Sequence, residues 1–402
     1  MQIVHAHEPL PPAFTRSLFL AGPSPRGSGH PDWRAEALAL LADRGFDGVV
    51  FTPLPAGGFT PATDYDAQVA WEHAAMERSD RLLFWIPRDL AVLPGFTTNV
   101  EWGRFERSGR VVLGYPPAAA KMRYLDWHAR RNRVPIRHTL AETVDAVLAD
   151  FGPPARREGA EIGVPLEVWH TPVFQRWYAA QRAAGNRLDE ARLEWAWWVG
   201  KRRHLVLWAL QVSVFVAREN RNKINELVFG RSDIAAVVLY EAGASTVDDT
   251  RVVVIREFRA CGQASDGYVH ELPGGSSFQP EDALVHIAVE EVAEEVGLTI
   301  APERLRLVGA RPLVATLSAH HATVFAVALT DEEVAFLATQ PGPFGLAESS
   351  EVTWPALCRV GDLRAAPDVD WANLGMILQA LDTAGGVKLA SGGAAGMPCS
   401  GR

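Results

Sequence analysis

The chain has 402 residues, of which 48% are apolar and 22% are charged, and its formal net charge is −9 at pH 7. This composition is typical of a globular protein, and the length indicates two domains, because a single hydrophobic core rarely grows so large. The acidic balance argues against a general nucleic-acid-binding protein, which would need a basic face. Small anionic ligands are still compatible with this charge, since local arginines or metal ions can hold them.

Cysteines and apolar runs limit the location of the protein. Cys261, Cys358 and Cys399 have no paired spacing, so we expect neither a disulfide framework nor a zinc site, and a reducing cytoplasm fits best. The most apolar stretch, residues 205–217, is too short to cross a bilayer and contains Gln211. The N-terminus also lacks the pattern of a signal peptide. We therefore expect a cytoplasmic protein with no membrane partner.

Residues 1–152 alternate between apolar strands and amphipathic helices. The predicted strands are 17–22, 48–53, 81–87 and 110–115, and the predicted helices are 33–44, 66–78, 99–107 and 141–151. Such alternation predicts an α/β domain with a doubly wound, Rossmann-like parallel sheet. Ligands of that architecture bind beyond the carboxyl ends of the strands, where the loops over 22–29 and 88–98 would meet.

Three short motifs lie at these strand ends. They are Phe19-Leu-Ala-Gly22, Ser79-Asp80 and Thr97-Thr-Asn-Val-Glu-Trp-Gly103. Together they resemble the nucleoside 2-deoxyribosyltransferase family and its nucleotide N-glycosidase relatives. The resemblance implies that Glu101 attacks the anomeric carbon of a nucleoside, and a carboxylate suits this because the transition state resembles an oxocarbenium ion.

The same resemblance implies supporting residues around Glu101. Glu72 would protonate the leaving base or orient Glu101, and we expect three residues to contact the substrate: Gly22, Thr98 and Asn99. The aspartate that the family usually has before the nucleophile is replaced here by the region around Gly95. The family often builds its pocket from several subunits, so a homo-oligomer is expected.

Simpler interpretations of these residues remain open. Glu101 could be a helix N-terminal acid favoured by the helix macrodipole, and Glu72 a solvated helix residue. Asp80 is more typical of a cap or turn than of a catalyst, and His73 of a structural histidine.

Pro, Gly and charged residues over 152–160 interrupt the periodic pattern, so we place a domain boundary there. Residues 153–204 are interpreted as a linker and an aromatic-rich helical segment whose rings mostly pack in a core. Its aromatic residues between 167 and 198 are Trp169, Phe174, Trp177, Tyr178, Trp195, Trp197 and Trp198.

A second domain is predicted over 205–384. Its predicted strands are 205–216, 234–240, 251–258, 305–308, 322–329 and 351–353. A Pro-Gly-Gly turn follows the third of them and precedes an acidic helix. Residues 385–402 are rich in Gly, Ala and Ser, and we expect a disordered tail.

The segment from Glu271-Leu-Pro-Gly-Gly275 to Glu290-Glu-Val-Ala-Glu-Glu-Val-Gly-Leu298 resembles the Nudix box of pyrophosphohydrolases. The resemblance implies an α/β/α sandwich with a mixed sheet. On a helix, three carboxylates of this segment converge and would hold Mg²⁺ or Mn²⁺, which prefer oxygen ligands: Glu291, Glu294 and Glu295. Such a metal ion can activate water, so Glu294 is also a catalytic candidate.

Two features of this segment depart from the family. Glu290 replaces the family arginine that orients the metal-binding carboxylates, and the loop has one extra residue near Glu281 and Asp282. An ordinary solvated acidic helix face is the alternative interpretation.

Other residues of the second domain are candidates for substrate contacts. Arg256, Arg259 and Gly275 would contact a diphosphate, since guanidinium groups match its oxygens, although both arginines could also be surface residues at a strand end. Glu271 could add a metal ligand, and Glu348 or Glu351 could supply a base.

These patterns predict a bifunctional enzyme of nucleotide metabolism. The first domain would cleave or exchange an N-glycosidic bond, and the second would hydrolyse a diphosphate linkage with Mg²⁺. The alternatives are a nucleotide sensor that binds without turnover, and a protein in which only one domain is active. The sequence identifies neither the base nor the sugar nor the leaving group.

Overall fold

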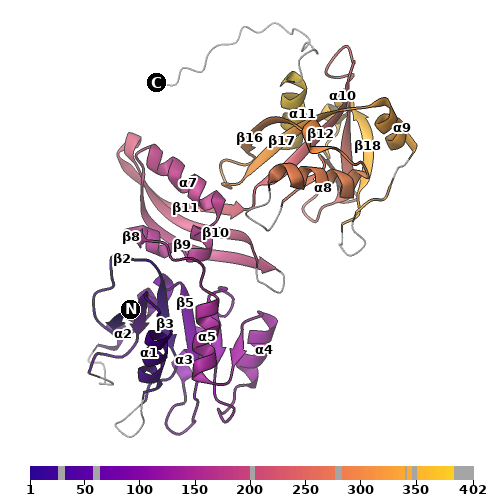
Figure 1. Cartoon of the computed structure of the whole chain (residues 1–402). Helices are drawn as coiled ribbons and strands as arrows, with labels where there is room; N and C mark the ends of the chain where they lie inside the picture. Colours follow the sequence, from indigo (N-terminus) through magenta and orange to yellow (C-terminus); the bar gives the residue numbers. More distant parts are fainter. Residues whose placement is uncertain are drawn as a thin grey trace. The chain divides into compact units, whose positions relative to one another are not determined.

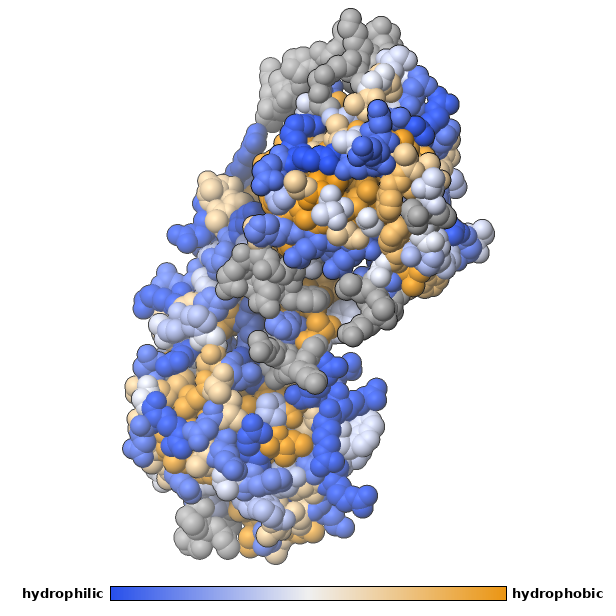
Figure 2. All heavy atoms as spheres, turned by 45° about the vertical axis from the view of Figure 1, so that its right-hand side comes forward, coloured by the Kyte–Doolittle hydropathy of each residue, from blue (hydrophilic) through white to orange (hydrophobic). Residues whose placement is uncertain are grey.

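The computed structural model describes residues 1–25, 32–57, 64–199, 204–276, 283–339, 342–345 and 351–383. The chain forms two compact units, Met1–Arg231 and Ser232–Arg402, whose elements are labelled in Figure 1. Among the described residues, no helix is long and apolar enough to cross a membrane. On the face drawn in Figure 2, hydrophilic and hydrophobic residues are interspersed over both units.

The first unit is built on a six-stranded sheet in the order β1-β4-β3-β5-β6-β7. All five strand pairings are parallel. The strands are β1 (Gln2–His5), β3 (Ser17–Ala21), β4 (Val49–Thr52), β5 (Arg81–Trp85), β6 (Val111–Gly114) and β7 (Ile136–Arg137). The predicted parallel sheet is thus confirmed, and β1 and β7 extend it at its two edges.

Helices cover both faces of this sheet because successive strand residues point to opposite sides. Leu18 and Leu20 of β3 pack in one core with α1 (Trp33–Asp43) and α5 (Leu140–Ala149). Phe19 and Ala21 pack in the other core. The helices on that second side are α2 (Tyr65–Arg78), α3 (Phe96–Phe105) and α4 (Arg123–Arg131). The fold is therefore doubly wound.

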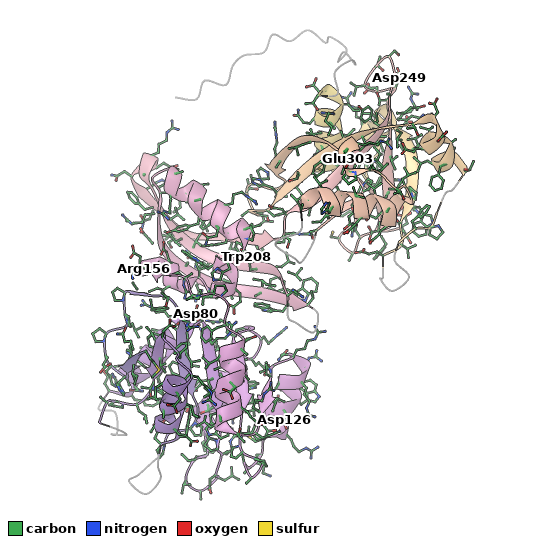
Figure 3. All side chains as sticks on the ribbon, viewed as in Figure 1. Asp80, Asp126, Arg156, Trp208, Asp249 and Glu303 are labelled. Carbon is green, nitrogen blue, oxygen red and sulfur yellow. The ribbon has the colours of Figure 1, made fainter. Side chains whose placement is uncertain are left out.

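Asp80, just before β5, connects the parallel sheet to the chain around Arg157, which comes after the last helix of that sheet. Its carboxylate accepts hydrogen bonds from the backbone N–H of Ser17 at 2.9 Å and from both terminal nitrogens of Arg157 at 2.7 Å. Asp80 and Arg157 are both fully buried. Figure 3 shows Asp80 at the junction of the two sheets of this unit. Asp80 thus has a structural role, but in a buried ion pair and not as the cap or turn residue that the sequence indicated.

A three-stranded antiparallel sheet completes the first unit, in the order β11-β10-β9. The strands are β9 (Arg187–Val199), β10 (His204–Val216) and β11 (Arg221–Arg231). The predicted strand 205–216 therefore exists as β10, but it is the central strand of this sheet and belongs to the first unit. The division between units falls at 231/232, which replaces the predicted boundary after residue 204.

Only the first half of the aromatic-rich segment is helical. Its helices are α6 (Leu166–Trp169) and α7 (Pro172–Ala183). Three short elements come earlier in the chain: β2 (Ala13–Phe14), β8 (Arg157–Glu158), which pairs with β2, and the 3₁₀ helix η1 (Gly159–Gly163). Phe174 of α7 packs its ring against Trp208 of β10 at 6.2 Å between centroids. The second half, which was predicted to be helical, is β9, because its backbone pairs with β10 over eleven residue positions.

The second unit contains a seven-stranded mixed sheet in the order β14-β13-β12-β17-β16, with β15 beside β12 and β18 beside β13. The strands are β12 (Ile234–Glu241), β13 (Arg251–Phe258), β14 (Tyr268–Glu271), β15 (Gly274–Gly275), β16 (Arg306–Pro312), β17 (His321–Leu329) and β18 (Trp354–Arg359). β12 and β17 are parallel, and the other pairings are antiparallel. The last predicted strand, 351–353, is wrong, because the strand of this region, β18, covers the residues that follow it.

Helices lie on both faces of this mixed sheet. Ala235, Val237 and Leu239 of β12 belong to the core under α8 (Leu284–Val296) and α9 (Asp331–Thr339). Ala236 and Val238 belong to the core under α10 (Val360–Ala365) and α11 (Trp371–Thr383). The unit is a three-layer α/β/α arrangement. The predicted tail over 385–402 lies outside the described residues.

Candidate active sites

The first candidate site lies where the loops after β3 and β5 approach each other. A Cβ atom on Gly22, directly after β3, would lie 2.1 Å from the carbonyl oxygen of Trp85 at the end of β5. Gly95, at the start of α3, lies against Pro23 of the first loop. These contacts confirm that the two loops meet at the carboxyl ends of the strands, the ligand-binding edge of a doubly wound sheet.

Two carboxylates and one guanidinium group gather at this edge. Glu101 lies on α3, Glu72 on α2 and Arg34 on α1, and Arg34 interacts electrostatically with both acids. Arg34 is 1% exposed. Its guanidinium donates to the carbonyl oxygens of Leu20 at 3.1 Å and Gly22 at 2.6 Å. These bonds fix a positive charge beside the two acids.

Burial and mutual repulsion perturb the pKa values of this acid pair. Burial first, and then the charge of Glu72, raise the pKa of Glu101 to about 7, while Arg34 lowers it. Burial raises the pKa of Glu72 as well, although the side chain of Gln68 donates a hydrogen bond to Glu72 at 2.6 Å. Two neighbouring carboxyl groups with raised pKa values can share proton-transfer and nucleophilic roles near neutral pH.

The expected substrate contacts occupy different positions at this site. Thr98 is buried in the first turn of α3. Asn99 is exposed, and its side-chain oxygen accepts a hydrogen bond from Arg88. Gly22 begins the first loop, and its backbone carbonyl accepts the hydrogen bond from Arg34. His73, by contrast, is exposed on α2.

The sequence did not predict Arg34 or Arg88 as site residues. Arg34 follows the helix cap Asp32, whose carboxylate binds it at 3.0 Å, so local sequence suggests only a capping pair. Arg88 is 6% exposed, burial lowers its pKa, and its Nε has no hydrogen-bond partner within the described ranges. An arginine directly after an apolar strand that ends in Ile-Pro was the available signal.

The second candidate site lies at the carboxy-terminal half of α8 in the second unit. The backbone N–H of Gly274 donates to Glu295 at 2.9 Å. A Cβ atom on Gly275 would lie 1.8 Å from Oε1 of Glu291, so only glycine leaves room for that carboxylate. The Pro-Gly-Gly turn therefore positions both glutamates against the sheet.

Further acids surround this helix. Arg259 pairs with Glu257 at 2.9 Å and with Glu271 at 2.7 Å. We refer to these two acids together with Glu291 and Glu295 as the carboxylate cluster. Burial, followed by charges of neighbouring acids, raises the pKa of Glu291 to about 7. Burial also raises the pKa of Glu295 to about 8, against the hydrogen bond from Gly274.

The structure brings together only part of the predicted metal site. Glu291 and Glu295 lie together, but Glu294 is exposed on α8. Among the described residues, no group of three His, Cys, Asp or Glu side chains is placed to hold a metal ion. Glu257, which the sequence did not single out, is 5% exposed in the cluster, and an acid within an apolar strand was its signal.

The remaining candidates of this unit are divided between two environments. Arg256 stacks over the ring of Tyr268 at 4.3 Å and pairs with Asp266, so it lies apart from Arg259 and the carboxylate cluster. Glu351 is close enough to raise the pKa of Glu291. Glu348 and the predicted loop extension near Glu281 and Asp282 lie outside the described residues.

Comparison with known families supports the assignment of the first unit. Residues 15–119 match the family model described as nucleoside 2-deoxyribosyltransferase like. The match spans β3 to β6 and includes Glu72 and Glu101. The first unit thus contains a nucleoside 2-deoxyribosyltransferase-like domain. A comparison with curated proteins finds no match to the chain.

A domain of this kind fits a place in nucleotide metabolism. The matched region contains both loops that meet at the carboxyl edge of the sheet. It ends well before the second unit, so any activity of that unit has to be argued from its own residues.

Proposed function

We propose that the first unit cleaves or exchanges the N-glycosidic bond of a nucleoside or nucleotide. The observation that carries this proposal is the Glu101–Glu72 pair beside Arg34, at the ligand-binding edge of a nucleoside 2-deoxyribosyltransferase-like domain. Enzymes that break glycosidic bonds usually use two carboxyl groups as catalytic residues, because one group attacks or stabilises the sugar while the other transfers a proton.

The two acids would divide the chemistry as follows. The ionised carboxylate of Glu101 attacks the anomeric carbon and forms an ester to the sugar, while the carbon–nitrogen bond breaks and its electron pair stays on the base. Glu72, whose pKa burial raises, donates the proton that neutralises the departing base. Water then hydrolyses the ester, or a second base displaces it. Arg34 favours the ionised form of Glu101.

The test is product analysis with purified full-length protein and a panel of nucleosides and nucleoside monophosphates. Release of free base in the presence of chelator, and its loss in Glu101→Gln, would support the proposal. The matched variant Glu36→Gln changes an exposed acid of α1 in the same unit and should keep the activity. Equal base release by the wild type and Glu101→Gln would refute the assigned role of Glu101.

We further propose that the second unit hydrolyses a diphosphate linkage with Mg²⁺ or Mn²⁺, as its similarity to the Nudix box implies. The supporting observation is the carboxylate cluster, in which Glu291 and Glu295 are held against the Pro-Gly-Gly turn. Clustered buried carboxylates repel one another, and a divalent cation with oxygen ligands relieves that repulsion. The cluster offers the carboxylate oxygens that such an ion prefers, although among the described residues no three acidic side chains are already placed to hold it.

Glu291 and Glu295 would hold the ion, with Glu257 and Glu271 as further oxygen donors. The bound ion would supply Lewis-acid stabilisation of the diphosphate and a more acidic water. Arg259 pairs with Glu257 and Glu271, and its guanidinium would also match the oxygens of a phosphate group bound beside the cluster. Arg256, stacked on Tyr268, would contact a more distant part of the substrate.

A nucleotide sensor is the second candidate function for this unit. The exposed position of Glu294 and the acid at Glu290 favour it, because both weaken the family's metal-orienting arrangement. Incubation with nucleoside diphosphate sugars and dinucleotides separates the two. Mg²⁺-dependent nucleoside monophosphate that disappears in Glu295→Gln would support hydrolysis, whereas Mg²⁺-dependent binding without any product would support the sensor.

A further inference from the structure

A cavity of about 900 Å³ lies in the first unit, at the amino-terminal edge of the parallel sheet. Its walls come from the end of α3 and the loop into β6, from the end of α4, and from the second half of β9. Glu101 and the two loops of the candidate active site are not among its lining residues. None of the predicted catalytic, metal-binding or substrate-binding residues lines this cavity, so neither proposed activity accounts for it.

Positive charge dominates the lining. Six arginines line the cavity, against three glutamates: Arg104, Arg107, Arg110, Arg131, Arg133 and Arg192, with Glu77, Glu106 and Glu194. Each glutamate already has a basic partner, since Glu77 pairs with Arg104, Glu106 with His128 and Glu194 with Arg192. Three positive charges therefore remain in excess on a chain whose net charge is −9.

The excess positive charge is available to a ligand. Arg107 and Arg131 are exposed, and within the described part of the chain neither forms an ion pair; Arg131 lies only over the ring of Trp127, at 5.4 Å. Arg110 is 4% exposed and donates to the carbonyl oxygens of Glu77 at 3.2 Å and Ser79 at 2.7 Å. One buried guanidinium held by two carbonyl oxygens and two exposed guanidinium groups line the same cavity, and this combination favours an anion with several oxygens, such as a phosphate chain.

Tryptophans form the facing wall. Trp195 and Trp197 stand two residues apart on β9, so both rings project from the same side of the strand. Their centroids are 6.4 Å apart, and the side chains are 47% and 51% exposed. Trp198 also lines the cavity and lies directly against Gly109. Two half-exposed indoles offer planar surface on which an aromatic ring can stack.

We propose that this cavity is a second ligand site, separate from Glu101, that binds a nucleoside diphosphate or a nucleotide of similar size. The base stacks on Trp195 and Trp197, and the phosphates pair with Arg107 and Arg131. The volume falls in the range of small-molecule pockets, so a single nucleotide fits it better than a nucleic-acid strand does. The acidic net charge of the chain also opposes binding of long polyanions.

Calorimetric titration of the full chain with ADP and GDP, in the presence of EDTA, tests the site. We expect the double variant Arg107→Glu/Arg131→Glu to bind at least about 100-fold more weakly, because each charge-assisted bond to phosphate is worth about tenfold or more. Trp195→Ala/Trp197→Ala should lose roughly tenfold. Glu101→Gln should retain this binding, which keeps the result independent of the proposed glycosidic activity.

Matched controls use exposed residues of the same types elsewhere, Arg218→Glu on the first unit and Trp371→Ala on the second, and both should bind like the wild type. Photo-crosslinking with an azido-ADP should label peptides that contain residues 104–110 or 192–199. Binding of neither nucleotide, unchanged affinity in both pocket variants, labelling elsewhere, or equal affinity for inorganic diphosphate and ADP would each overturn the proposal.

Discussion

Replacing Glu101 by glutamine should inactivate the first unit and at the same time stabilise it. The reason is that Glu101 carries its charge in an unfavourable place: it is largely buried and lies near Glu72. Glutamine has nearly the same shape but cannot ionise, so it removes both the desolvation cost and the repulsion. A catalytic residue often lowers the stability of the fold, so a gain in unfolding free energy on its replacement fits a functional role for Glu101.

The magnitude follows from the pKa of Glu101, which rises from its ordinary value of 4.5 to about 7. At ~1.4 kcal/mol per pKa unit, ionising this group in the folded protein costs about 3 kcal/mol above pH 7. We expect Glu101→Gln to recover about 2–3 kcal/mol of unfolding free energy at pH 8. The gain should be small at pH 4, where the acid is protonated in both the folded and the unfolded states.

The direction in which the stability effect of Glu101 changes with pH follows from its raised pKa. A carboxyl group whose folded pKa is raised binds its proton more tightly in the folded state, so its contribution to stability is present below pH 4.5 and is lost as the pH rises through about 7. The difference in unfolding free energy between Glu101→Gln and the wild type should therefore grow between about pH 4.5 and 7 and stay constant above.

Urea unfolding of the full chain at pH 5, 6, 7 and 8, followed by fluorescence and circular dichroism, measures this difference for the first unit's transition. Glu36→Gln is the control: it removes an exposed acid from the first turn of α1, where a negative charge is favourable, so it should change stability slightly and in the opposite direction. The reasoning would be refuted if Glu101→Gln destabilised the protein at pH 8, or if its effect did not change with pH.

Three further predictions follow from the sites and the core. The rate of base release at low substrate should rise about tenfold per pH unit up to about pH 7, because Glu101 must be ionised to attack, and should fall once Glu72 loses the proton that it donates; a rate with no rising limb below pH 7 would contradict the role of Glu101 as nucleophile. Millimolar Mg²⁺ should raise the thermal midpoint of the wild type and of Glu290→Gln but not of Glu291→Gln; equal stabilisation of the two variants would argue against metal binding at the carboxylate cluster. Asp80→Asn should cost about 3–5 kcal/mol in urea unfolding, because it leaves the buried guanidinium of Arg157 without its charged partner, and a loss below about 1 kcal/mol would contradict the central role of this pair.

The sequence predicted the parallel sheet well because local pattern and tertiary position agree there. Short apolar strands alternate with helices, and the carboxyl ends of such strands meet at one edge, so the approach of the loops at Gly22 and Gly95 followed from topology. The grouping of β10 could not be predicted in the same way. Its apolar run suits any buried strand, and only its pairing with β9 and β11 assigns it to the first unit.

The candidate sites show a similar division. Residues one helical turn apart, such as Glu291 and Glu295, were predictable because spacing alone puts them on one face. Glu294 lies ~100° around the helix from Glu295, and since Glu295 faces the sheet, Glu294 is directed outward. Arg34 reaches its site through long-range packing, which no local pattern records, whereas the acid of Glu257 within an apolar strand was a local signal that the sequence analysis did not use.

The most direct test of the central claim is mass-spectrometric detection of free base after incubation of the full chain with nucleosides and nucleoside monophosphates in EDTA. We predict that the wild type releases a base, that Glu101→Gln releases none, and that Glu36→Gln releases it at the wild-type rate. If the wild type binds these compounds but releases no base at any pH from 5 to 9, the first unit is a binding domain and the assigned chemistry of Glu101 is wrong.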